Sequence, residues 1–295
     1  MMILLMLVPV LTWCQGQGGR AENRFWVTTP KDSLLAENIL AGLKEYLAEK
    51  ENVSVGELMA RAGKALVGQP YVAGTLDGKP ADTTEDNAWR EELRIYLTRT
   101  DCIIFVETCL ALARTAAQDS DFRMFANEIR QSRYRDGRVS AYADRLHYTT
   151  EWAHQGEARG VLKDVTEELG GVPLDRKINY MSAHPGSYPL MDDIDAIRRA
   201  EDTINSKPKY YIPKSKVAGA LREIRTGDII CLVTTVEGLD VSHVAMAVVE
   251  GGTVRMLHAS TGSMKVTVDP KTLKEYLEGR TSIAGIQVLR PLDIY

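Results

Sequence analysis

Hydrophobic positions divide the chain into a helical first part and a strand-rich last part. Apolar residues at helical spacing, with capping signals such as Ser54 and Glu57, predict helices at 32–50, 54–67, 102–115, 122–131 and 192–205. Later β-type runs predict strands at 229–235, 243–249, 253–259, 264–268 and 284–289, with one helix at 270–278. This order predicts an α+β fold in a single domain, with a helical part over about 30–225 and a β-rich part over about 226–295.

The helix predicted at 102–115 has a cysteine at its first position. The segment reads DCIIFVETCLALART from Asp101, which is a suitable N-cap residue. Its apolar residues recur on one face, namely Phe105, Val106, Cys109, Leu110 and Ala113. A helix N-terminus has unpaired N–H groups and the positive end of the helix dipole. We therefore expect Cys102 to be stabilised as the thiolate, which is the nucleophilic form.

Two histidines are expected to face each other in the β-rich part. Gly251-Gly252 predicts a two-residue hairpin turn, which fixes the register of the strands on either side. In that register His243 and His258 share one face of the sheet as diagonal neighbours, about 7–8 Å apart at the backbone. Such a pair suits a bond between the rings, with His243 as the base for Cys102 and His258 as its orienting partner.

Other interpretations of these three residues stay open at this point. A single strand histidine is more often structural than catalytic, and a buried cysteine more often packs in a core. Cys102, His243 and His258 could also hold a catalytic zinc ion. No CxxC or HExxH motif supports a metal, and we expect no metal and no other cofactor.

Composition and charge limit the location and the partners of the protein. The chain has 295 residues, of which 44% are hydrophobic and 26% charged, as in ordinary globular proteins. Its net charge of -4, without a long basic run, gives no reason to expect a nucleic acid partner. The apolar run 2–13 is shorter than the roughly 20 residues of a membrane span and predicts a signal peptide that ends at Gly16. The alternatives are a lipid anchor at Cys14 and a buried N-terminal segment.

The cysteines left after such a cleavage include at least one free thiol. Three remain in the mature chain 17–295, and an odd count cannot pair completely. Cys102 and Cys109 are separated by about 10 Å of helical rise, which is too far for a disulfide bond. Cys109 and Cys231 lie in apolar runs and are expected to pack in the core. We expect a periplasmic monomer with Cys102 as the free thiol.

Two further segments carry candidates for substrate contacts. Tyr71 lies in a loop with Gly and Pro at 68–76, where it either packs or lines the pocket of the cysteine. The segment 134–152 combines arginine, histidine and aromatic residues without a regular period. It fits a solvated loop with aromatic anchors, or a site for a sugar or a carboxylate. The candidates in it are Arg145, His147, Tyr148 and Trp152.

Several motifs resemble those of known cell-wall hydrolases. Asp101-Cys102 at a helix start, TGD at 226–228, SHVAM at 242–246 and HAS at 258–260 resemble the NlpC-type superfamily of papain-like cysteine hydrolases. Three longer motifs are more specific: PYVAGTL at 70–76, DCIIFVE at 101–107 and RLHYTTEW at 145–152. They resemble the N-acetylmuramoyl-L-alanine amidase-like branch of that superfamily, and the likeness to this branch covers most of the mature chain.

The resemblance implies both a fold and a reaction. The fold would be a papain-like NlpC-type core, a nucleophile helix packed on an antiparallel sheet, with additional N-terminal and inserted helical segments. The reaction would be hydrolysis of the amide between N-acetylmuramic acid and L-alanine in peptidoglycan fragments, including 1,6-anhydro-muropeptides. Cys102 would be the nucleophile, His243 the general base and His258 the third member. Tyr71 and Asp101 would contact substrate together with the segment 145–152.

The chain departs from the superfamily pattern at one motif. The usual Asp-Cys-Ser-Gly reads Asp-Cys-Ile-Ile at 101–104. In the related endopeptidases, the Asp-Ser neighbourhood recognises the free amine of an N-terminal L-alanine. The loss of Ser and Gly favours a substrate whose alanine nitrogen is acylated. A γ-D-glutamyl-diaminopimelate endopeptidase stays the alternative enzyme, and a non-catalytic muropeptide-binding protein is the alternative from another class.

Overall fold

The computed structural model describes residues 25–77 and 90–294. The predicted signal peptide and Cys14 lie outside these residues. The helices are α1 (Pro30–Glu49), α2 (Val55–Ala65), α3 (Cys102–Ala117), α4 (Phe122–Arg133), α5 (Thr149–Ala158), α6 (Tyr180–Ala183), α7 (Ile194–Asn205), α8 (Val217–Ala220) and α9 (Leu273–Glu278). The strands are β1 (Val27–Thr28), β2 (Arg94–Ile95), β3 (Leu162–Asp164), β4 (Val172–Pro173), β5 (Tyr210–Pro213), β6 (Ile229–Thr234), β7 (Val241–Glu250), β8 (Thr253–Ser260), β9 (Lys265–Thr272) and β10 (Ile283–Pro291). The α+β prediction is confirmed.

The main sheet is antiparallel and is built around a meander of three long strands. Its order is β4-β5-β10-β6-β7-β8-β9, and β3 also pairs with β10. The predicted two-residue turn joins β7 to β8, where Gly251 and Gly252 have φ values of 57° and 76°. Both values suit a turn that only glycine adopts without strain. Glu250 pairs with Thr253, which confirms the predicted register.

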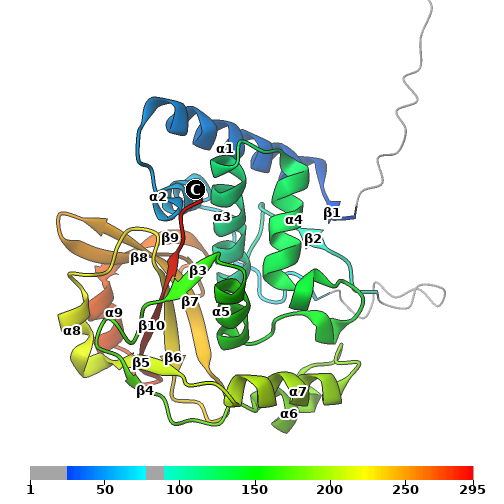
Figure 1. Cartoon of the computed structure of the whole chain (residues 1–295), viewed down its shortest axis with the longest axis vertical. Helices are drawn as coiled ribbons and strands as arrows, with labels where there is room; N and C mark the ends of the chain where they lie inside the picture. The colour runs from blue at the N-terminus through cyan, green and yellow to red at the C-terminus, as the bar shows by residue number, and fades with distance from the viewer. Residues whose placement is uncertain (1–24, 78–89, 295) are drawn as a thin grey trace, which may run out of the picture.

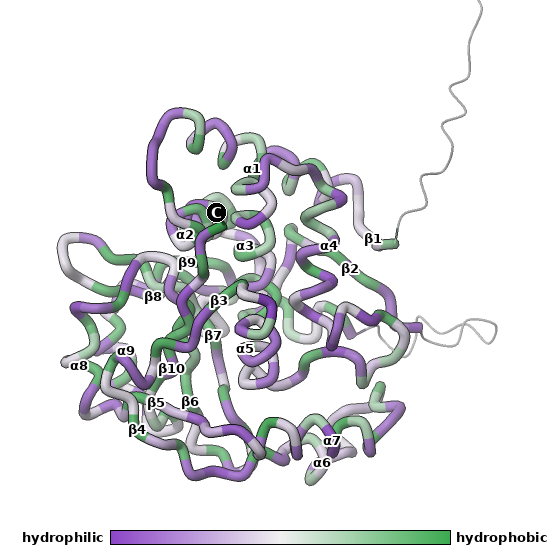
Figure 2. The backbone as a smooth tube through the Cα atoms, viewed as in Figure 1, coloured by the Kyte–Doolittle hydropathy of each residue, from purple (hydrophilic) through white to green (hydrophobic). Residues whose placement is uncertain are grey.

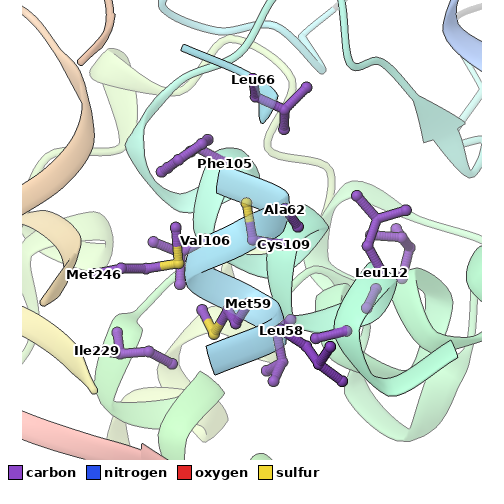
Figure 3. Packing of buried hydrophobic residues seen from close by; sticks show 14 of the residues in the cluster. Leu58, Met59, Ala62, Leu66, Phe105, Val106, Cys109, Leu112, Ile229 and Met246 are labelled. Atoms are coloured by element: carbon purple, nitrogen blue, oxygen red, sulfur yellow. The ribbon is translucent and has the colours of Figure 1, made fainter. Parts of the chain in front are cut away.

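Helix α3 lies at the centre of the molecule and packs against both the sheet and the other helices. Its residues from Ile104 to Ala113 are all buried, because α2 covers one side and β7 and β8 lie on another. Figure 3 shows Phe105, Val106 and Cys109 of this helix beside Met59 of α2 and Met246 of β7. α1 and α4 also pack against α3, and α5 packs against α4 and against β3 of the sheet (Figure 1). This packing fixes the N-terminus of α3 against the sheet.

Two short features of the fold explain how α2 meets the sheet. The predicted capping box of α2 is confirmed, since Ser54 accepts from the Glu57 N–H and Glu57 accepts from the Ser54 N–H. Next to it, Gly227 in the turn before β6 has φ +89°, and a Cβ there would lie 2.1 Å from the Gly56 carbonyl oxygen. The close approach of the two backbones therefore requires glycine.

The helical part contains strands that the sequence does not predict and three additional helices, α5, α6 and α8. β3, β4 and β5 add to the sheet beside β10. α5 begins at Thr149, inside a segment predicted to be irregular. Its buried face includes Thr150 and Glu151, which bond to Asp240 and Arg135, so no apolar period marks the helix. Figure 2 shows hydrophilic stretches in outer helices such as α4 and α7, and hydrophobic ones in buried β6.

The last predicted helix starts later than expected. α9 begins at Leu273 and not at 270, because β9 continues through Pro270 to Thr272. The register of β8 and β9 shifts between Arg255 and Leu257, so that three residues of β9 face one residue of β8. Such a bulge turns side chains toward new directions. Within residues 25–77 and 90–294, no helix is long and apolar enough to cross a membrane.

Candidate active site

Cys102 lies at the N-terminus of α3, as predicted, with its side chain against the sheet. Asp101 is the N-cap residue and its carboxylate accepts from the Ile104 N–H at 3.0 Å. The backbone N–H of Val244 in β7 is within hydrogen-bonding reach of the thiol. Cys102 is partly exposed, whereas Cys109 and Cys231 are fully buried, and all three are free thiols. Cys102 is therefore the thiol that a substrate can reach.

The ionisation of Cys102 differs from the sequence-based expectation. Burial, followed by the negative charge of Asp101, raises the pKa of the Cys102 thiol to about 11. The N–H groups of Val244, Ile103 and Cys102 lower this pKa, as expected at a helix N-terminus, but by less. Desolvation disfavours the charged form more than these donors favour it. The resting group is a thiol, and the expectation of a thiolate is wrong.

The two histidines form the expected pair. His243 of β7 and His258 of β8 are joined by a hydrogen bond of 2.8 Å between Nε2 of the first ring and Nδ1 of the second. The rings are nearly perpendicular, with centroids 5.0 Å apart. Burial, and then the charges of His258 and Arg280, lower the pKa of His243 to about 3. The imidazole of His243 is therefore neutral at neutral pH, as a general base must be.

Tyr71 lies beside the cysteine, as one of its two interpretations predicts. Its N–H donates to the Met264 carbonyl at 3.0 Å, and the next residue, Val72, donates to Thr100 at 2.8 Å. These bonds hold the loop between the start of β9 and the segment just before α3. Burial, followed by the charges of Cys102 and Asp101, raises the pKa of the Tyr71 phenol. The phenol is therefore a neutral donor next to the thiol.

A cavity of about 190 Å³ lies beside the N-terminus of α3 and contains several predicted substrate residues. Its lining includes Gly74, Asp77, Asp101, Glu107, Arg133, Tyr142, Arg145, His147 and Trp152. Arg145 forms ion pairs with Asp77 at 2.7 Å and with Glu91 at 2.9 Å. Burial lowers the pKa of His147 to about 4, so this ring is neutral. The cavity thus presents cationic, anionic and neutral hydrogen-bonding groups next to α3.

Two predicted substrate residues have structural partners instead. Tyr148 is 2% exposed, donates to Glu201 at 2.7 Å and accepts from the Met181 N–H at 2.8 Å. The structure therefore does not bring it to the cavity. Trp152 lines the cavity wall, but it is 3% exposed and its indole N–H donates to Ser132 at 3.0 Å. The Trp152 ring supports the cavity wall, and the polar groups of both side chains are bonded within the protein.

Sequence reasoning missed three residues near the histidine pair. Asp269 of β9 has a carboxylate oxygen 3.5 Å from Nε2 of His258. The Tyr276 ring lies edge-on to His258, with centroids 6.1 Å apart. The Arg280 guanidinium stacks on Tyr276 at 4.3 Å. The available signal was their position in the strand and helix that follow His258 in the meander.

Other hollows and alternative sites are separate from this arrangement. Two hollows of about 820 and 780 Å³ border α1, and none of the predicted site residues lines them. In the described part of the chain, no group of three His, Cys, Asp or Glu residues is placed to hold a metal ion. The zinc alternative, which needs Cys102, His243 and His258 as one such group, is not formed.

Comparisons with known proteins show which family and which solved structures this chain is similar to. The sequence profile of the N-acetylmuramoyl-L-alanine amidase-like family matches residues 61–286. The crystal structure of an N-acetylmuramoyl-L-alanine amidase from Bacteroides uniformis ATCC 8492 is 33% identical, with a TM-score of 0.72 over 80% of this chain and 98% of that chain. A Bacteroides fragilis protein, named as a candidate xylanase, is 34% identical, with a TM-score of 0.69 over 79% and 99%.

A more distant protein shares the fold. Protein LPG0564 from Legionella pneumophila is 19% identical, with a TM-score of 0.66 over 88% of this chain and 97% of that chain. No curated protein matches the sequence. These solved structures are thus matched over almost their full length, whereas between 79% and 88% of this chain is covered by the matches.

Proposed function

The chain belongs to the N-acetylmuramoyl-L-alanine amidase-like family, and on that basis we propose that it hydrolyses the amide between the lactyl group of N-acetylmuramic acid and L-alanine in peptidoglycan fragments. The observation that carries the proposal is the bond between His243 and His258 on the sheet against which Cys102 packs. A nucleophile helix on an antiparallel sheet that carries the base supports assignment to the papain-like NlpC type.

Cys102 is the proposed nucleophile and His243 the proposed general base. With the pKa of the thiol at about 11 and that of the imidazole at about 3, the proton stays on sulfur before substrate binds. It moves to His243 as the sulfur attacks the lactyl carbonyl carbon. The N–H of Cys102 supports the resulting oxyanion at the positive end of α3. Cys102 thus stays a neutral thiol in the resting protein and loses its proton only during the attack on the substrate.

The second half of the reaction uses the same imidazole. When the C–N bond breaks, His243 gives its proton to the alanine nitrogen, and the stem peptide leaves with a free amine. The sugar stays bound to sulfur as a thioester. Water then attacks this thioester while His243 accepts a proton from it, and the proton returns to sulfur as the lactyl carboxylate is released. His258 orients His243 through both halves.

The cavity beside α3 supplies the proposed substrate contacts. Tyr71 lies next to the thiol, and Asp101, Arg145 and His147 line the cavity. These groups suit hydroxyl, amide and carboxylate groups of a muropeptide. We propose soluble fragments, including 1,6-anhydro forms, as the substrates. The segment 2–16 supports export to the periplasm, and the chain is proposed to act as a monomer.

Mass spectrometry of defined muropeptides tests the proposal. Anhydro and non-anhydro fragments are incubated with wild type, Cys102→Ala and the matched control Cys109→Ala, which changes a buried thiol on the same helix. We expect wild type and Cys109→Ala to release intact stem peptide and free sugar, and Cys102→Ala to release neither.

Other outcomes would contradict separate parts of the proposal. Hydrolysis by Cys102→Ala would rule out the nucleophile. Cleavage inside the stem peptide would indicate the endopeptidase and refute the inference from Ile103-Ile104. If folded wild type binds these fragments without cleaving them, the binding-protein alternative holds. The mass of the mature N-terminus separates cleavage after Gly16 from lipidation of Cys14.

A further inference from the structure

Asp269 of β9 lies beside His258, at the ring nitrogen that does not bond to His243. We propose that it is a positioning residue that fixes the tautomers of both imidazoles and leaves Nδ1 of His243 unprotonated toward Cys102. The role in catalysis rests on the function proposed above, whereas the tautomers themselves can be observed in the resting protein. Asp269 touches neither substrate nor sulfur and acts only through His258.

The strand geometry brings the carboxylate to the ring. β9 pairs with β8, and the register shift places three β9 residues, Asp269 among them, opposite one residue of β8. Thr267 pairs with His258, so Asp269, two residues further along β9, is on the same face of the sheet, and the Oδ2 to Nε2 distance is 3.5 Å. The side chain of His258 is 1% exposed and that of Asp269 is 13% exposed. The pair is therefore largely shielded from water.

No other polar group is available to Nε2 of His258 in the described part of the chain. This atom is buried and has no hydrogen bond shorter than its 3.5 Å approach to Asp269. That distance is longer than a normal hydrogen bond. Hydrogen bonds of catalytic groups are often long in the free enzyme and shorten when substrate binds. If Nε2 of His258 carries a proton, its N–H can donate to the carboxylate of Asp269. If Nε2 is unprotonated, its lone pair faces the carboxylate oxygen, which is also an acceptor, so no hydrogen bond can form.

The proton positions in both rings follow from this single contact. A neutral imidazole has one N–H, and an ionised carboxylate only accepts. If Nε2 of His258 carries its proton, then Nδ1 of His258 is an acceptor. At 2.8 Å from it, Nε2 of His243 must be the donor. The proton of His243 is thereby assigned, and its Nδ1 carries a free lone pair.

The opposite arrangement would disable the base. With the proton of His258 on Nδ1, its Nε2 lone pair would face the carboxylate of Asp269. His243 would then accept on Nε2 and carry its proton on Nδ1. Because Nε2 is already engaged with His258, Nδ1 is the ring nitrogen of His243 left to accept a proton. A protonated Nδ1 cannot take the proton of the thiol.

Nitrogen-15 NMR of histidine-labelled protein tests the tautomers without any substrate. The chain has five histidines, so His243 and His258 can be assigned from single substitutions. We expect both rings of wild type to be neutral at pH 7 and protonated on Nε2. In Asp269→Leu we expect this preference to be lost, and kcat to fall about 10²–10⁴-fold with little change in KM, as for loss of a general base.

Two further variants separate positioning from folding. Asp269→Asn keeps an oxygen that can accept from His258, so it should restore the tautomers and recover most of the lost kcat. Thr267→Val is the matched control on β9, because Thr267 pairs with His258 in the register but its hydroxyl donates to the Val268 carbonyl. It should retain wild-type tautomers. If Asp269→Leu does not fold, the spectra of wild type and Asp269→Asn still show whether both rings are protonated on Nε2, and so still test the proposal.

Two results would overturn the proposal. One is a wild-type spectrum with His258 protonated on Nδ1. The other is a folded Asp269→Leu variant with unchanged tautomers and kcat. If wild type shows the expected tautomers but hydrolyses no muropeptide, the assigned reaction fails while the positioning of the rings by Asp269 stands.

Discussion

Replacing Asp101 with Asn should make the thiol of Cys102 more reactive without destabilising the protein. Asp101 has two effects at the start of α3. Its carboxylate caps the helix through the Ile104 N–H, and its negative charge raises the pKa of the neighbouring thiol. Asn caps a helix about as well as Asp but has no charge. The substitution therefore separates the two effects.

The size of the effect follows from the charge and from the nucleophilicity of the thiolate. Removing a nearby like charge should lower the pKa of Cys102 by about 1–2 units. The thiolate fraction at pH 8 would then rise about 10–100-fold, because this pH is well below the pKa of about 11. Each thiolate becomes about 3–10-fold less nucleophilic, since nucleophilicity falls with pKa. The net alkylation rate should rise about 3–10-fold.

Alkylation by iodoacetamide at pH 8, followed by mass spectrometry of the Cys102 peptide, measures this rate. The fully buried Cys109 and Cys231 serve as internal unreactive thiols. Asp121→Asn is the matched control, because Asp121 caps α4 in the same way. It should leave the rate unchanged.

Stability measurements complete the test. Asp101→Ala should raise the alkylation rate but also remove the cap, which costs about 1 kcal/mol and lowers Tm by roughly 2–4 °C. Asp101→Asn should leave Tm within about 1 °C of wild type. If Asp101→Asn and Asp121→Asn react at the same rate as wild type, the charge of Asp101 does not act on the thiol, and our account of its pKa is refuted.

Three further predictions concern stability and pH. Tyr148→Phe leaves the Glu201 carboxylate and the Met181 N–H without the hydroxyl that bonds them, at about 1–3 kcal/mol for each unpaired group. Tm should therefore fall by several degrees, with no change in KM. An increased KM at unchanged Tm would instead indicate that Tyr148 contacts the substrate. Gly227→Ala should lower the free energy of unfolding by about 3–5 kcal/mol, because a Cβ would collide with Gly56. Gly252→Ala, at a residue with φ +76° and open space around it, should lower it by only about 1–2 kcal/mol. Chemical denaturation measures both values, and equal losses would contradict this account. Because the pKa of His243 is lowered to about 3, the base stays unprotonated until the pH falls toward that value, and kcat/KM should show no acid limb above about pH 5; a limb near 6.5 would contradict it.

The parts of the site that the sequence predicts are those set by local rules. The position of Cys102 follows from an N-cap residue and an apolar stripe, and both are properties of adjacent residues. The pairing of His243 with His258 follows from the two-residue turn, because register is fixed once the turn length is known. Each conclusion needs only one element and its neighbour.

The parts that the sequence does not predict depend on burial and irregular pairing. The pKa of Cys102 depends on how deeply α3 is enclosed, and the helix effect alone suggests the wrong direction. Asp269 lies one residue beyond the predicted end of its strand, because Pro270 suggested a helix where β9 continues through a bulge. Tyr148 resembled a ligand contact, yet its hydroxyl serves the packing of α6 and α7.

The raised pKa of Cys102 also protects its sulfur from oxidation. Peroxides and disulfides react with thiolates, so their attack depends on the ionised fraction. With a pKa of about 11 this fraction is about 10⁻⁴ at pH 7, roughly 300-fold below that of a free cysteine with a pKa of about 8.5. Cys102, kept as a neutral thiol, can thus persist where no reductant regenerates it, and under the proposed mechanism it loses its proton only when it attacks a substrate.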